Sequence, residues 1–192
     1  GSHAAKFMHE SEFKIVGISD VSGAYYREDG LDIPAALHHM IENRSLQGFE
    51  NAEKITNDEL LELDCDLLVP AALGGVVTME NVEKIRAKYI VEGANGPVDA
   101  DADERLFERG IAVLPDILAN AGGVTVSYFE WVQNRQYYSW DLNRVRQQLD
   151  SILSSAFEDV WQLANEKNVS LRTAAFMIAI RRVKRSTELG GF

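Results

Sequence analysis

The feature that most constrains the fold is the alternation of short apolar runs with segments of helical periodicity. The apolar runs, each typical of a strand buried on both faces, are residues 14–20, 67–70, 89–91 and 112–114. The segments with helical patterns between them are residues 33–43, a stretch beginning at Thr56, residues 78–85 and residues 101–109. Strands that alternate with helices predict an α/β fold with a parallel, doubly wound sheet covered on both faces.

The pattern changes after residue 123, where no further strand-like run follows. Apolar residues recur at helical spacing through residues 142–167, and Ser170 can cap a last helix over residues 172–188. Other local signals mark helix ends, because Thr56 and Glu59 have the spacing of a capping box and Gly110 suits a left-handed position after a helix. The sequence therefore predicts an α/β part over residues 1–123 and C-terminal helices over residues 124–192.

Composition excludes several classes of function. The 192 residues suffice for one domain with a sizeable core, and 30 acidic against 19 basic residues give a net charge of -11 that repels nucleic acid. The sequence has no apolar run of about 18 residues and no secretory leader, so we expect a cytoplasmic protein without membrane contact. Cys65 is the single cysteine and the four histidines lack ligand spacing, so no metal site is predicted.

The beginning of the chain has two interpretations. Sheets that bind dinucleotides start with a strand and a glycine-rich turn, and an acidic residue follows about 20 positions later. Asp20 has that spacing from Gly1, so Gly1 can be the third glycine of such a turn, with residues 2–10 as the helix after it. The other interpretation is that residues 1–3 are a tag remnant.

We favour the first interpretation, which makes this a Rossmann-like sheet whose first strand and first glycines precede residue 1. That strand would be the central one. Direct pairing of the strand near Lys14 with the strand near Leu67 would therefore contradict the interpretation.

Polar and small residues follow several of the predicted strands and should meet at the carboxyl edge of the sheet, where ligands of doubly wound folds bind. The carboxylate of Asp20 can accept hydrogen bonds from the adenosine ribose hydroxyls and repels a 2′-phosphate, which favours NAD over NADP; alternatively it caps a turn. Asn95 suits the nicotinamide ribose or carboxamide. Asn120 precedes a helix expected to begin near Val124, and capping that helix is its alternative role. The small side chain of Ala71 lets a dinucleotide approach the backbone.

Four stretches together resemble the glutamate, leucine, phenylalanine and valine dehydrogenases, and among them the glutamate dehydrogenases. They are residues 19–23 (Ser-Asp-Val-Ser-Gly), 70–73 (Pro-Ala-Ala-Leu), 91–97 (Val-Glu-Gly-Ala-Asn-Gly-Pro) and 115–131 (Pro-Asp-Ile-Leu-Ala-Asn-Ala-Gly-Gly-Val-Thr-Val-Ser-Tyr-Phe-Glu-Trp). The resemblance covers Gly1 to about Glu188. It implies oxidative deamination of L-glutamate to 2-oxoglutarate and ammonia, with hydride transfer to NAD, by a homo-oligomer that is commonly a hexamer.

The resemblance also implies roles for individual residues. The cofactor-binding set is Gly1, Asp20, Val21, Ala71, Ala72, Asn95 and Asn120. Ala71, Ala72 and Asn120 then lie at the nicotinamide part of the cofactor. In the family, the serine matching Ser127 binds the side-chain carboxylate of glutamate, and the valine matching Val124 lines the aliphatic stem. Residues 124–192 would pack on the NAD-binding part and on a separate substrate domain.

No catalytic residue is predicted in this chain, because the family's catalytic lysine and aspartate belong to the substrate domain and no segment here matches it. We therefore expect the chain alone to be inactive. Two other functions stay open: a leucine, valine or phenylalanine dehydrogenase, which carries an apolar residue at the position of Ser127, and a non-catalytic nucleotide-binding module. Ser127 could also bond back to its own helical turn.

Overall fold

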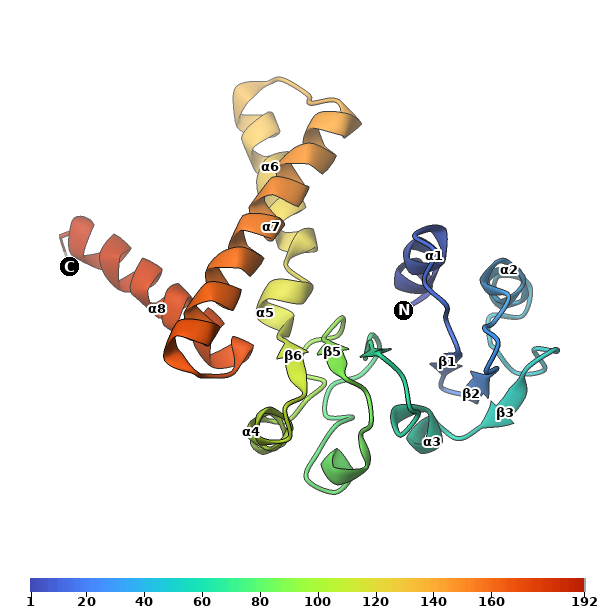
Figure 1. Cartoon of the computed structure of the whole chain (residues 1–192). Helices are drawn as coiled ribbons and strands as arrows, with labels where there is room; N and C mark the ends of the chain where they lie inside the picture. Colours follow the sequence, from blue (N-terminus) through green and yellow to red (C-terminus); the bar gives the residue numbers. More distant parts are fainter. Residues whose placement is uncertain (192) are drawn as a thin grey trace.

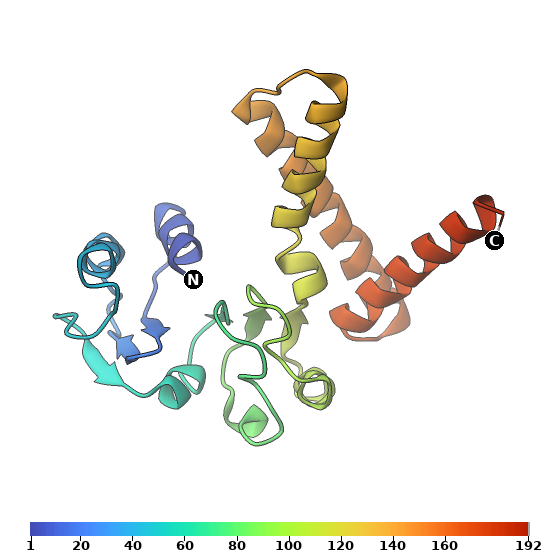
Figure 2. The same cartoon turned by 180° about the vertical axis from the view of Figure 1, so that it is seen from behind.

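The computed structural model describes residues 1–191 and contains the α/β part and the C-terminal helices (Figures 1 and 2). The elements of the α/β part are α1 (Ser2–Glu10), β1 (Gly17–Asp20), β2 (Gly23–Tyr26), α2 (Ile33–Asn43), β3 (Glu53–Ile55), α3 (Asn57–Leu61), β4 (Leu67–Leu68), the 3₁₀ helix η1 (Val82–Lys84), β5 (Tyr89–Val91), α4 (Ala100–Glu108), β6 (Ala112–Leu114) and α5 (Asp116–Ala119). The helices that follow are α6 (Gly122–Gln136), α7 (Leu142–Lys167) and α8 (Leu171–Leu189).

Strands β4, β5 and β6 form the predicted parallel sheet, in that order. The register places Leu68 opposite Ile90 and Ile90 opposite Val113, and all three side chains are buried in one core with residues of η1 and α4. Burial of an aliphatic side chain of this size contributes about 1.5–3 kcal/mol. Because the three strands run in the same direction, their carboxyl ends and the loops that follow meet at one edge.

Strand β1 belongs to a second sheet that the sequence did not predict. It pairs antiparallel with β2, and β2 pairs antiparallel with β3. The chain reverses between Asp20 and Gly23, and Gly23 has a φ of 131°, a conformation that glycine adopts without strain. Within residues 1–191, β1 does not pair with β4, so the pairing that would contradict a preceding strand is not seen. The preceding strand itself stays a prediction.

The helix predicted over residues 78–85 is wrong. Only the short η1 forms there, because the side chain of Asn81 replaces helical hydrogen bonds: its Oδ1 accepts from the Thr78 amide at 2.9 Å and its Nδ2 donates to the Val76 carbonyl at 2.8 Å. Asparagine side chains commonly compete with helix formation in this way.

The predicted helix ends are confirmed elsewhere. Thr56 and Glu59 form a complete capping box, Ser170 accepts a hydrogen bond from the Thr173 amide, and Gly110 has a φ of 76°. Helix α6 starts at Gly122, two residues before the expected position, with Ala121 preceding it.

A second core joins α5 to the C-terminal helices. Its buried residues include Leu118 of α5, Leu163 of α7 and Ala174 of α8. Helix α6 packs along α7, whereas the C-terminal half of α8 extends away from the other elements (Figure 1). None of the described helices is both long and apolar enough to cross a bilayer. The described residues also contain no cluster of three or more histidine, cysteine or carboxylate side chains suited to a metal ion.

Candidate functional site

The loops after β4 and β5 pack closely against each other at the carboxyl edge of the parallel sheet. The amide of Ala94 donates to the Pro70 carbonyl at 2.9 Å. A Cβ added to Gly93 would lie 3.1 Å from the Cβ of Ala71, so no larger residue fits there without displacing a neighbour. The amino group of Gly1 is 3.4 Å from the Ala71 carbonyl oxygen. Gly1, Ala71 and the loop that carries Asn95 are therefore neighbours, and Ala72 follows with its side chain exposed.

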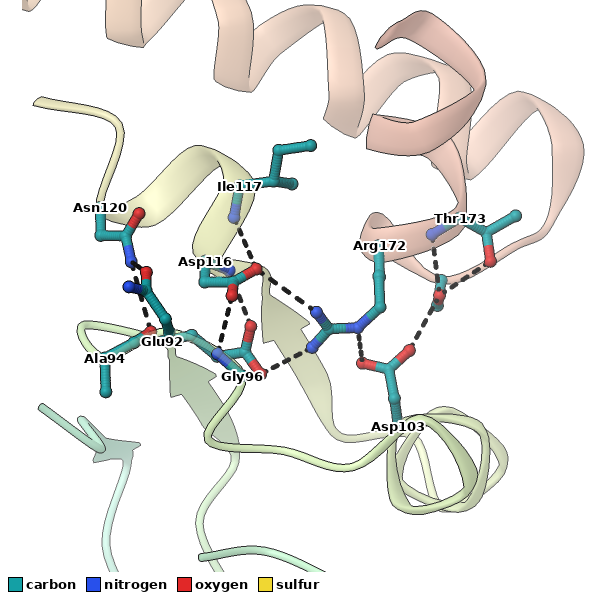
Figure 3. A network of polar contacts seen from close by, with 11 residues as sticks. Glu92, Ala94, Gly96, Asp103, Asp116, Ile117, Asn120, Arg172 and Thr173 are labelled. Carbon is teal, nitrogen blue, oxygen red and sulfur yellow. Dashed lines mark hydrogen bonds and ion pairs between the residues drawn. The ribbon is translucent and has the colours of Figure 1, made fainter. Parts of the chain in front are cut away.

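Asn95 and Asn120 form an amide pair at this edge. Nδ2 of Asn120 donates to Oδ1 of Asn95 at 2.7 Å and to the Ala94 carbonyl at 3.3 Å (Figure 3). Within the described residues, Oδ1 of Asn120 and Nδ2 of Asn95 have no protein partner. The pair thus retains one acceptor and one donor without an internal partner. Asn120 does not cap α6, so that alternative is wrong; it ends α5 instead.

Asp20 ends β1 and holds two backbone segments. Its Oδ1 accepts from the amide of Ser22 at 2.7 Å and from the hydroxyl of Ser22 at 2.5 Å, and its Oδ2 accepts from the amide of Leu46 at 2.7 Å. Burial alone raises the pKa of Asp20, but the hydrogen bonds from Ser22 and Leu46 outweigh it and lower the pKa below its usual value of 3.8. A carboxylate has roughly four acceptor positions, so about one remains for a ligand. The turn-capping role is therefore present, and Val21 projects beside it with its side chain 95% exposed.

Val124 and Ser127 lie three residues apart on α6, and both are exposed. Residues with this spacing share one face of a helix. The hydroxyl of Ser127 makes no hydrogen bond within residues 1–191, whereas Thr125 on the same helix donates to the Ala121 carbonyl at 2.8 Å. The alternative in which Ser127 bonds to its own turn is thus not seen.

Asp20 and the amide pair belong to different parts of the fold. Asp20 ends β1 of the antiparallel sheet, whereas Asn95 lies in the loop after β5 of the parallel sheet and Asn120 directly follows α5 (Figure 1). The structure shows no direct contact between Asp20 and either asparagine among the contacts of the described residues. The predicted cofactor residues therefore form two groups, one around Ala71 and the amides and one at the end of β1.

A buried ionic network behind the amide pair was missed by the sequence analysis (Figure 3). Arg172, near the start of α8, places Nη2 2.6 Å from Oε1 of Glu92, Nε 3.1 Å from Oδ1 of Asp103 and Nη1 3.6 Å from Oδ1 of Asp116. The contact with Asp103 is electrostatic, because these two buried atoms lack hydrogen-bond geometry. Burial alone lowers the pKa of Arg172, but Glu92 and Asp103 outweigh it and raise the pKa above its usual value. One guanidinium thus forms ion pairs with three carboxylates.

One signal in the sequence could have suggested this network. Cations are favoured near the C-terminal end of a helix and disfavoured in its first turn, yet Arg172 is in the first turn of α8. A carboxylate partner close by resolves that conflict. Glu92, at the end of a buried strand, has a side chain with 0% exposure and is the partner.

The fold and the edge together define an α/β protein whose polar side chains gather where parallel strands end, the position at which such proteins bind ligands. The sequence profile of the glutamate/leucine/phenylalanine/valine dehydrogenase family matches residues 1–191. The chain therefore belongs to this family.

Individual relatives agree with that assignment. A glutamate dehydrogenase of Thermotoga maritima is 50% identical over 178 residues, which are 93% of this chain and 43% of that protein. The crystal structure of a hetero-hexameric glutamate dehydrogenase from Thermus thermophilus in a leucine-bound form has a TM-score of 0.92 at 26% identity, covering 100% of this chain and 45% of the other. Glutamate dehydrogenase from Peptoniphilus asaccharolyticus has a TM-score of 0.81 at 34% identity, with 100% and 44% covered. The chain thus spans less than half the length of these relatives.

Proposed function

We propose that this chain is the NAD-binding part of a glutamate dehydrogenase that converts L-glutamate to 2-oxoglutarate and ammonia. The observation that carries the proposal is the Asn95–Asn120 amide pair at the carboxyl edge of the parallel sheet, with one donor and one acceptor unpaired among the described residues. A carboxamide offers the complementary acceptor and donor. Family membership and the 50% identity to a glutamate dehydrogenase support the reaction class.

Bound NAD would supply the hydride acceptor, and the residues of this chain would hold and orient it. Asn95 and Asn120 would bind the carboxamide or ribose of the nicotinamide half. Gly93 has no side chain and packs on Ala71, so a dinucleotide would be able to approach the backbone there, beside Gly1 and Ala72.

Asp20 and Val21 would receive the adenosine half at the end of β1. Because about one acceptor position of the carboxylate remains, we propose a single ribose hydroxyl bond at Oδ2 rather than two. The negative charge still repels a 2′-phosphate, and this supports NAD over NADP.

Val124 and Ser127 would bind the substrate from α6. A hydroxyl without an internal partner can donate to the side-chain carboxylate of glutamate, while the valine contacts the methylene groups. The main alternative is a dehydrogenase for leucine, valine or phenylalanine, but a hydroxyl facing such apolar substrates would lose hydrogen bonding. The other is a nucleotide-binding module without catalysis.

We further propose that residues 1–123 form the NAD-binding domain and residues 124–192 a helical segment that packs on it and on a substrate domain. That second domain would contribute the catalytic lysine and aspartate, so the 192-residue chain alone is expected to be inactive. The parent enzyme, meaning the glutamate dehydrogenase to which the chain is proposed to belong, would be a homo-oligomer. The Thermus relative is a hetero-hexamer, which supports assembly into an oligomer but not identity of the subunits. Its proposed location is the cytoplasm.

Initial rates of the parent enzyme test the function. With L-glutamate and L-leucine as substrates and NAD⁺ and NADP⁺ as cofactors, the fastest combination is expected to be glutamate with NAD⁺. Faster turnover of leucine would establish the alternative dehydrogenase. Turnover of glutamate by the isolated 192-residue chain would show that the active site has been misplaced. Saturable NADH binding by the parent protein without turnover of either amino acid would favour the non-catalytic nucleotide-binding module.

A further inference from the structure

We propose that Arg172 is a positioning residue for the nicotinamide half of the dinucleotide, although it lies behind the amide pair and does not contact it. This inference rests on the proposed function and assigns a role to a side chain of α8, whose first turn packs near β6. Its basis is a continuous series of contacts from the guanidinium to the backbone next to each asparagine, which is Gly96 after Asn95 and helix α5 before Asn120.

The series begins at Glu92 and passes through Asp116. Nη2 of Arg172 holds Oε1 of Glu92 at 2.6 Å, and the second oxygen, Oε2, accepts from the Asp116 amide at 2.7 Å. Asp116 in turn accepts from the Gly96 amide at 2.8 Å through Oδ2. Figure 3 shows these residues converging between the end of β5 and the start of α5.

Both asparagines are adjacent to anchored backbone. Asn95 immediately precedes Gly96, whose amide Asp116 holds, and Asn120 immediately follows α5, whose first residue is Asp116. The distance between the two amides depends on where loop 93–96 lies relative to α5. The network fixes that relation, because Asp116 belongs to α5 and binds the loop.

Burial makes the network dependent on Arg172. The side chains of Glu92, Asp103 and Arg172 are 0%, 6% and 17% exposed, so water contributes little to solvating their charges. Removing one partner of a buried ion pair leaves an uncompensated charge. The surrounding structure must then move so that this charge is solvated or neutralised. Loss of the guanidinium would therefore displace Glu92 and Asp116, and with them the amide pair.

Adenosine binding should be independent of this network. Asp20 belongs to the antiparallel sheet, and its hydrogen bonds go to Ser22 and Leu46. The affinity for a ligand that contains only the adenosine side of the dinucleotide thus distinguishes a local displacement of the two asparagines from general damage to the protein. ADP is such a ligand, because it lacks both the nicotinamide ring and the ribose that carries it.

The test measures dissociation constants of NADH and ADP by calorimetry in the parent enzyme and its Arg172→Gln and Arg172→Lys variants. Arg172→Gln is expected to weaken NADH binding about tenfold, the value of one or two hydrogen bonds to the ligand, while ADP binding changes less than about twofold. Arg172→Lys should lie between wild type and Arg172→Gln, because it retains the charge but cannot contact three carboxylates. Arg182→Gln is the matched control, since Arg182 also belongs to α8 but pairs with Asp159 at 3.1 Å on the surface.

Each outcome decides the proposal. Unchanged NADH affinity in Arg172→Gln, or equal weakening of both ligands, overturns the positioning role. If Arg172→Gln does not fold, the two dissociation constants are compared in Arg172→Lys instead. Loss of binding of both ligands in Arg172→Lys would also overturn the positioning role. A wild-type enzyme that binds neither ligand instead refutes the proposed function, so the two failures are distinguishable.

Discussion

Asp20 shows how one side chain can organise the backbone and remain available to a ligand. Three hydrogen bonds from Ser22 and Leu46 keep the carboxylate ionised and fix its orientation before any ribose arrives. Ser127 is the opposite case, since its hydroxyl is exposed and makes no hydrogen bond among the described residues. Both residues were predicted from the sequence as ligand-binding positions. The number of acceptor positions left on Asp20 could not be predicted, because its hydrogen bond from Leu46 joins residues 26 positions apart.

Asp20→Asn should narrow the preference of the parent enzyme for NAD⁺ over NADP⁺. The amide removes the negative charge that repels a 2′-phosphate, so the ratio of the two kcat/KM values is expected to fall about tenfold, or ~1.4 kcal/mol. Asp66→Asn is the control, because Asp66 is an exposed carboxylate paired with Lys88 at 2.6 Å. An unchanged ratio in Asp20→Asn would mean that this carboxylate does not face the 2′ position.

The segment around Leu46 should loosen in acid because of Asp20. The folded-state pKa of Asp20 lies below the usual 3.8, so its contribution to stability is fully present above that value and is lost as the pH falls through the lower folded pKa. Hydrogen exchange of the Leu46 amide, compared at pH 5 and below pH 3.8, is expected to show reduced protection at the lower pH after correction for intrinsic rates. The effect should be absent in Asp20→Asn; equal pH dependence in both proteins would assign it to another group.

Ser127→Val should change substrate preference. Loss of a hydrogen bond to the glutamate carboxylate is expected to lower kcat/KM for glutamate about 10- to 100-fold, while the value for leucine stays level or rises. Thr125→Val removes a hydroxyl two residues away that bonds to the Ala121 carbonyl, and it should leave the ratio of the two substrates unchanged. Equal effects of the two variants would remove Ser127 from the substrate site.

At the scale of elements, most helix caps and the parallel sheet were predicted correctly, whereas the helix over residues 78–85 and the antiparallel sheet were not. Helix α7 has the predicted bounds, and the caps at Thr56 and Ser170 form, because a cap depends on neighbouring residues alone. Strands β2 and β3 escaped prediction, since their pairing joins segments about thirty residues apart and gives no periodic signal of its own. The same reason hid the contact of Arg172 with Glu92, which are 80 positions apart.

The candidate site was predictable to the extent that topology determined it. Parallel strands end at one edge, so Asn95 and Asn120 were expected to lie close together, and their side chains are 2.7 Å apart. Asp20 did not follow this rule, because among the described residues β1 pairs with β2 in a separate antiparallel sheet and not with β4.

Gly93→Ala tests the close approach of the loops after β4 and β5. Its Cβ would lie 3.1 Å from the Cβ and 3.4 Å from the Cα of Ala71, so about 1–3 kcal/mol of overpacking is expected, together with weaker NADH binding. Ala71→Gly in the same protein should restore part of both. Gly123→Ala, which meets no atom within 4 Å, is the control and should be neutral or stabilising in denaturant unfolding. Normal NADH affinity in Gly93→Ala would show that this contact does not shape the site.

At the scale of the whole molecule, exposed apolar side chains agree with the proposal of a second domain. Phe176, Ile180 and Val183 of α8 are 48%, 65% and 66% exposed, and Trp131 of α6 is 57% exposed. The C-terminal half of α8 extends away from both sheets, and α6 packs along α7 (Figure 2). Large exposed apolar residues gathered on such helices commonly mark a contact with another domain or subunit.

The most direct measurement is a crystal structure of the protein with NADH bound. We expect the nicotinamide carboxamide or ribose within hydrogen-bond distance of the Asn95 and Asn120 side chains, and the adenosine ribose beside Asp20. A dinucleotide bound away from the carboxyl edge of β4, β5 and β6, or one whose nicotinamide half contacts neither asparagine, would contradict this expectation.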